Sequence, residues 1–170
     1  MDWLTLHRHG VQNVLAGMGT ALTEEQARLL RRMAGRIILL YDADAAGQKA
    51  MFRSTEILLR QGVAVQAAVL PGEHDPDSFL RAEGTQAIRD VLAQAPPALD
   101  YFIRLGAQTH DLGRPEGKAQ AVEQLAPLLL ALEDPALREG YVARAAASLG
   151  LHPETLEQSM TESVMGVRLA

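Results

Sequence analysis

Residues 36–50 read RIILLYDADAAGQKA, and this stretch decides the fold. Its first six residues, 36–41, form a nearly unbroken apolar run that is typical of a strand buried on both faces. Asp42 and Asp44 follow directly, and the small residues after them open a helical pattern. Ligands of open α/β sheets bind beyond the carboxyl ends of the strands, so the two carboxylates lie where a site is expected.

The pair Asp42 and Asp44 has two interpretations. Two carboxylates one residue apart point the same way from an extended backbone and repel each other, and a hard divalent cation relieves that repulsion. Alternatively, Asp44 caps the helix that follows and Asp42 is a solvated neighbour. On these two residues alone, the capping interpretation is favoured.

The composition narrows the class of protein. A chain of 170 residues with 48% apolar and 22% charged residues is an ordinary globular protein, long enough to bury a core. The absence of cysteine excludes disulfides and thiolate metal sites and fits a cytoplasmic setting. No run has the length of a membrane span, and the amino terminus lacks a signal-peptide pattern. With a net charge of −5, any contact with nucleic acid would be local or bridged by metal.

Strand and helix signals alternate up to about residue 84. Three strands are predicted, at 11–17, 36–41 and 63–70. Between them, Thr23 and Gln26 have the spacing of a capping box that opens a helix, and a second helix is expected at 46–60, closed by Gly62. This β-α-β-α-β order predicts a parallel, Rossmann-like sheet with right-handed crossovers.

After Gly84 the strand signals stop. Helices are predicted near 85–95, 97–110, 115–132, 134–149 and 153–163. First-turn prolines are expected at Pro115, Pro135 and Pro153, an N-cap at Asp134, a left-handed C-terminal residue at Gly150 and a kink or break at Pro127. The sequence therefore predicts an α/β domain over residues 1–84 and an all-α helical bundle over residues 85–170.

A second acidic group follows the third predicted strand. The residues from Pro71 to Asp77 include Asp75 and Asp77, and carboxyl ends of parallel strands meet at one edge of a sheet. Asp42, Asp44, Asp75 and Asp77 are therefore expected within reach of each other. Oxygen ligands without cysteine favour Mg²⁺ or Mn²⁺ over zinc, and His74 is interpreted as a loop residue.

These residues resemble a known family. The run from Asp42 to Gly47 has the D-x-D-x-x-G pattern of TOPRIM domains. Other segments occur in the order and at the spacing of bacterial DnaG-type DNA primases: Met1-Asp2, 17–20, Leu70-Pro71, Asp75-Pro76-Asp77 and Glu83-Gly84. The later helices, with Tyr101-Phe102 and 114–118, resemble the helical subdomain that ends the primase polymerase core.

The resemblance implies a function and roles for the acids. A primase makes short RNA primers for DNA replication by nucleotidyl transfer, on a single-stranded DNA template and from ribonucleotides. Asp42 and Asp44 would be catalytic and the primary ligands of Mg²⁺ or Mn²⁺, with Asp75 and Asp77 assisting and Gly47 binding phosphate. A cytoplasmic, nucleoid-associated location is also implied.

The chain departs from the family at its first residue. It begins at the Met of the first TOPRIM motif, so the motif's catalytic Glu, its strand, the basic template-binding part and the helicase-binding tail are not among the 170 residues. We therefore expect impaired or no activity alone, no binding to the replicative helicase, and self-association or a rearranged amino terminus at the open sheet edge. Whether the chain is an enzyme stays open. The alternative is a stand-alone TOPRIM protein that binds metal and is either non-catalytic or nuclease-like.

Overall fold

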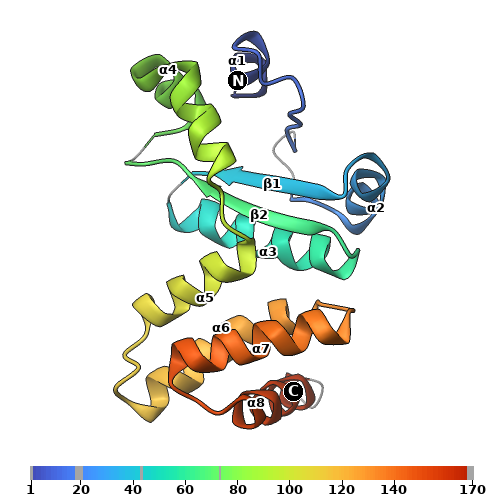
Figure 1. The fold of residues 1–170 in the computed structure, drawn as a ribbon, viewed down its shortest axis with the longest axis vertical. Coiled ribbons are helices and arrows are strands. Elements are labelled where there is room, and N and C mark those ends of the chain that lie inside the picture. Colours follow the sequence, from blue (N-terminus) through green and yellow to red (C-terminus); the bar gives the residue numbers. More distant parts are fainter. Residues whose placement is uncertain (1, 18–20, 43, 73, 168–170) are drawn as a thin grey trace. The chain divides into compact units, whose positions relative to one another are not determined.

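The computed structural model describes residues 2–17, 21–42, 44–72 and 74–167 (Figure 1). The chain divides into two compact units, Met1–Pro97 and Ala98–Ala170. The sequence placed the division at Gly84, where the helical backbone is indeed kinked, but the helical element that follows this kink, up to Ala93, still belongs to the first unit. The boundary therefore falls in the short connection that follows this element.

A parallel pair of strands forms the sheet of the first unit. Strand β1, Arg36–Tyr41, pairs with β2, Ala64–Val69, in the register that joins Arg36 to Ala64 and Tyr41 to Val69. The helix between them, α3 (Ala45–Arg60), packs against both strands (Figure 1). The predicted strand at 36–41 is confirmed, and the strand predicted at 63–70 is one residue shorter at each end.

The strand predicted at 11–17 is wrong. This segment follows helix α1, Asp2–Arg8, and is irregular. A strand persists only where its backbone groups join a ladder, and within the described residues this segment pairs with neither β1 nor β2. The helical state of α1 also contradicts the expectation that a rearranged amino terminus fills the sheet edge. The turn predicted at Gly19-Thr20 lies outside the described residues.

Two further helices complete the first unit. Helix α2, Glu24–Met33, begins with the predicted capping box, in which Thr23 and Gln26 bond reciprocally. Element α4, Pro76–Ala93, consists of two helical segments that meet in a kink at Gly84, whose φ of 82° and ψ of 176° are not helical. A small hydrophobic core joins α1 and the end of β2 to α4; it consists of Leu6, Leu70, Phe79, Leu80 and Ile88.

The second unit is helical throughout its described part. It contains α5 (Ala98–Thr109), α6 (Pro115–Leu130), α7 (Pro135–Leu149) and α8 (Pro153–Val167). The predicted first-turn prolines, the N-cap at Asp134 and the left-handed Gly150 are confirmed. Pro127 does not split α6, which continues past it to Leu130. No helix among the described residues is long and apolar enough to cross a membrane.

Candidate metal and nucleotide site

The turn from β1 to α3 carries the first two candidate ligands. Asp44 is the N-cap of α3, and its Oδ1 accepts a hydrogen bond of 2.6 Å from the backbone N–H of Gly47. The capping role that the sequence suggested for Asp44 is therefore present. Asp42 lies one residue beyond the end of β1, and both aspartates are exposed. Both aspartates therefore lie at the surface of the turn.

Gly47 is required by close packing of the backbone. A Cβ atom at this position would lie 2.2 Å from the carbonyl oxygen of Asp42 and 3.1 Å from its backbone nitrogen. Only glycine permits the first turn of α3 to approach the end of β1 so closely. The N–H of Gly47 already donates to Asp44, so phosphate binding by that group stays a prediction.

Asp75 occupies the matching position after β2. It is the N-cap of α4, and its Oδ1 accepts a hydrogen bond of 2.7 Å from the N–H of Ser78. This backbone hydrogen bond, followed by the Ser78 side chain, holds the pKa of Asp75 below its usual value. Asp75 is thus an exposed carboxylate that stays ionised in moderately acidic solution.

Asp77 is held on both of its carboxylate oxygens. Thr5 donates from its hydroxyl to Oδ1 over 2.7 Å, and the guanidinium of Arg81 lies 2.7 Å from Oδ2. Sequence reasoning missed both partners. The Asp77–Arg81 pair has the i, i+4 spacing of a helical ion pair and could have been found, but Thr5 lies 72 residues away and gives no local signal.

The four acids follow the same edge of the sheet without forming one cluster. The ladder ends at the Tyr41–Val69 pair, so both acidic loops begin beyond the same sheet edge. Within the described residues, however, no group of three or more His, Asp or Glu side chains is close enough to hold a metal ion. His74 bonds Ser78 over 3.2 Å and contacts the Phe79 ring edge-on, which supports its interpretation as a loop residue.

The donor set still fits a hard cation. Mg²⁺ is commonly held by one or two carboxylates and completes its octahedron with water and substrate phosphates. The exposed pair Asp42 and Asp44 meets that requirement. Asp77 already accepts from Thr5 on one oxygen and pairs with Arg81 through the other, and its role as a ligand stays a prediction.

Comparison with known proteins identifies the class first. Residues 1–80 match the Toprim-like family, and residues 99–154 match the DnaB-helicase binding domain of primase. The first match covers the β1–α3 and β2–α4 turns. The first unit is therefore a TOPRIM-like α/β domain, as the sequence predicted.

The relatives then define the family. The chain is 33% identical over 156 residues to the DNA primase of Clostridium acetobutylicum, covering 92% of this chain and 26% of that protein. It superposes with a TM-score of 0.80 on a DNA primase domain from Pseudomonas aeruginosa, at 35% identity over 94% of this chain and 51% of that one. A DnaG catalytic domain bound to ssDNA gives a TM-score of 0.77 at 28% identity, over 91% of this chain and 50% of that one.

These matches support a single family. The chain belongs to the bacterial DnaG-type DNA primases. It spans about a quarter of the length of the curated primase above and about half of the two solved domains. The expectation that the replicative helicase does not bind here is not supported, since residues 99–154 match a domain described by its binding to that helicase.

Proposed function

We propose that Asp42 and Asp44 bind a divalent cation, Mg²⁺ or Mn²⁺, and that this site serves nucleotidyl transfer in the synthesis of RNA primers on single-stranded DNA. One observation carries the proposal. Two exposed carboxylates stand at the carboxyl end of a parallel strand, in a turn that Gly47 packs tightly, in a chain that resembles DNA primases over most of its length.

The contribution of each residue follows from its position. Asp44 is oriented by the Gly47 N–H on one oxygen, which leaves the second oxygen available to a ligand. Asp42 is fixed through its backbone by the close approach of Gly47. Asp75 is an ionised carboxylate in the other acidic loop, beyond the same sheet edge, where Asp77 is held by Thr5 and Arg81. When bound, the cation supplies charge neutralisation for nucleotide phosphates, which is the main demand of phosphoryl-type transfer.

The metal site is tested by titrating Mn²⁺ and measuring free Mn²⁺ by electron paramagnetic resonance. The Asp42→Ala/Asp44→Ala double variant should lose the tightest binding. A matched variant, Glu24→Ala/Glu25→Ala, removes two adjacent carboxylates from the first turn of α2 and should bind as the unmodified chain does. Equal binding by all three proteins would place the cation elsewhere.

Catalysis by residues 1–170 alone is expected to be undetectable. The chain has 21 Asp and Glu residues against 16 Lys and Arg residues, and this net charge of −5 leaves little surface to neutralise a template backbone. Aromatic residues, at 4% of the chain, offer few platforms for stacking bases. Primer synthesis on a single-stranded template measures this directly. Cleavage of that template in Mn²⁺ would instead favour the nuclease-like alternative.

A second candidate function belongs to the second unit. The match of residues 99–154 to a helicase-binding domain favours a contact with the replicative DnaB helicase. Leu137 on α7 is 50% exposed and is the exposed large apolar side chain of this unit's described part, which makes it a suitable probe. Anisotropy of the labelled full chain with helicase should show binding that Leu137→Asp weakens, whereas Leu29→Asp, a change at a similarly exposed leucine of α2, leaves it intact.

A further inference from the structure

The two residues of the proposed cation site belong to different elements of the fold. Asp42 directly follows β1, whereas Asp44 is the N-cap of α3. The separation of their carboxylates therefore depends on the backbone between them and on how the first turn of α3 is placed against the end of β1. Mg²⁺ demands a near-ideal arrangement of its ligands. A contact that fixes α3 relative to β1 thus affects the affinity of the site.

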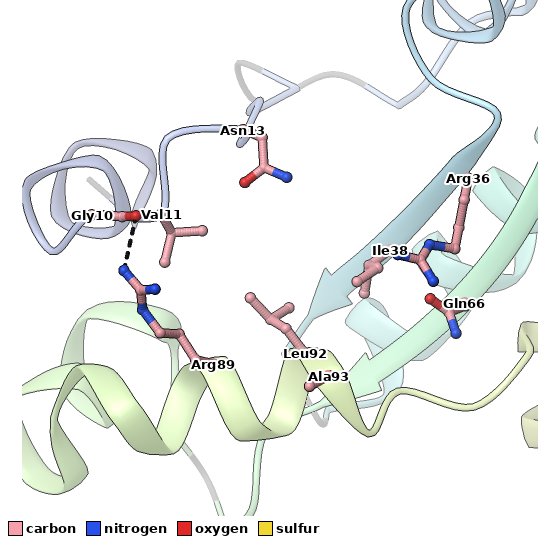
Figure 2. A pocket seen from close by; sticks show the side chains of 9 residues that line it. All are labelled: Gly10, Val11, Asn13, Arg36, Ile38, Gln66, Arg89, Leu92 and Ala93. Carbon is pink, nitrogen blue, oxygen red and sulfur yellow. Dashed lines mark hydrogen bonds between the residues drawn. The ribbon is translucent and has the colours of Figure 1, made fainter.

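Strand β1 presents different side chains to the two faces of the sheet, because successive residues of a strand alternate in direction. Ile38 extends toward Leu92 of α4, in a pocket of about 260 Å³ that Arg36 and Arg89 also line (Figure 2). Tyr41 is three residues further along β1, so its side chain points to the opposite face. Helix α3 packs on the sheet there and contacts Tyr41 directly.

A hydrogen bond joins the end of β1 to the middle of α3. The hydroxyl groups of Tyr41 and Ser54 lie 2.9 Å apart and share this bond. Ser54 is only 3% exposed, so water has little access to its hydroxyl. Ser54 lies seven residues after Gly47, which is roughly 10 Å along the helix axis. The helix is therefore attached to the end of β1 both by Gly47, which packs on the backbone of Asp42, and by Ser54.

This hydrogen bond constrains α3 more sharply than the apolar contacts around it. Met51 and Leu58 are buried on the same face of α3, and apolar burial has no preferred direction. A hydrogen bond, in contrast, weakens steeply when its distance or angle changes. It is also stronger in the protein interior than in water. The bond between Tyr41 and Ser54 therefore favours one position of α3 along β1.

We infer that Tyr41 and Ser54 are positioning residues of the cation site, because their hydrogen bond holds α3 on β1 and thereby keeps the carboxylates of Asp42 and Asp44 at one separation. The inference rests on the proposed function of these two aspartates. Neither Tyr41 nor Ser54 contacts the cation. Loss of their bond leaves both carboxylates present and charged but lets their separation vary, and the affinity for the cation falls.

The test compares Mn²⁺ affinity, measured by electron paramagnetic resonance, with stability, measured by urea denaturation. Tyr41→Phe, Ser54→Ala and the double variant should each bind Mn²⁺ about fivefold more weakly or worse, as expected when a group that orients a metal ligand is lost. Each single variant leaves one hydroxyl without its partner and should lower the urea midpoint. The double variant removes both hydroxyls and should recover most of that stability, while its affinity stays low.

The control is Thr23→Ala, which breaks the capping box of α2 in the same unit. It should lower the urea midpoint as the single variants do, yet bind Mn²⁺ within about twofold of the unmodified chain, because it is remote from the site. If the double variant Tyr41→Phe/Ser54→Ala binds as the unmodified chain does while Asp42→Ala/Asp44→Ala has lost binding, the cation site stands and the inference is overturned. If Asp42→Ala/Asp44→Ala still binds equally well, the cation site is refuted and the inference with it.

Discussion

A single glycine connects the fold to the candidate site. Gly47 stands in the D-x-D-x-x-G pattern that identified the class, and its conformation is ordinary for a helix. What excludes a side chain is the backbone of Asp42, which lies within 2.2 Å of where a Cβ would be. The pattern therefore reflects a packing requirement that holds the two aspartates in place, in addition to any direct contact with a ligand.

Gly47→Ala should lower the free energy of unfolding by at least about 2 kcal/mol, because the added methyl group meets backbone atoms that cannot move independently. Gly140 in α7 is the matched control. It is exposed, and a Cβ there meets nothing within 4 Å. Gly140→Ala should raise stability by about 0.5–1 kcal/mol through helix propensity. Urea denaturation of both variants measures the contrast, and similar effects of the two changes would contradict it.

Asp75 makes stability depend on pH. Its pKa is lowered in the folded chain by the hydrogen bonds from Ser78, so its contribution is present above the unfolded value, about 3.9, and is lost as pH falls through the lower folded value. The stability difference between the unmodified chain and Asp75→Ala should be constant near pH 6 and shrink below about pH 4. Denaturation of both proteins between pH 6 and pH 3 measures this stability difference. A difference that grows on acidification would contradict a lowered pKa of Asp75 in the folded chain.

Among the helices and strands, the features that depend on residues close together in the sequence were predicted correctly. The capping box of α2, the first-turn prolines of α6 and α7 and the bounds of β1 were all found where the sequence indicated. Each depends on residues within a few positions of each other. The strand predicted at 11–17 is absent because an apolar segment becomes a strand only when it pairs with a neighbouring strand. The local sequence cannot show whether such a neighbour exists.

Helix α3 contains an unsatisfied buried hydroxyl. Thr55 is fully buried and its Oγ1 has no hydrogen-bond partner, whereas the neighbouring Ser54 bonds the hydroxyl of Tyr41 over 2.9 Å. Thr55→Val keeps the shape and removes the unpaired group, so it should raise the free energy of unfolding by about 1 kcal/mol. Ser54→Ala breaks the bond to Tyr41 and should lower it by about 1 kcal/mol. A destabilised Thr55→Val variant would show that the hydroxyl has a partner, such as a buried water.

For the whole molecule, the free edge of β1 is the feature with the largest consequence. In the described residues only β2 pairs with β1, while Pro96 covers the outer edge of β2 by accepting from Ala67. Unpaired strand edges attract other chains. Large apolar side chains are also exposed in the first unit: Leu15 is 69%, Leu29 54% and Met33 75% exposed.

Self-association through the β1 edge therefore stays a prediction. Light scattering over a range of concentrations should show a mass that rises above the monomer's 18.4 kDa. The variant Leu29→Gln/Met33→Gln distinguishes pairing at the strand edge from association of exposed apolar side chains, because it removes two of these side chains and leaves the edge intact. Association that persists in this variant supports pairing at the edge, and a monomer at every concentration would exclude it.

The sequence by itself determined the class of the chain, the strand and turn that carry Asp42 and Asp44, and the helical character of the second half. These follow from patterns of neighbouring residues, in which caps, prolines and apolar spacing act over one or two turns. Only the tertiary structure decided that the segment 11–17 is not a strand, that Asp77 is held by Thr5 and Arg81, and that Arg36 and Arg89 share a pocket. Most of these features depend on contacts between residues that are far apart in the sequence. Such contacts are set by the path of the backbone through space, and no local sequence pattern specifies that path.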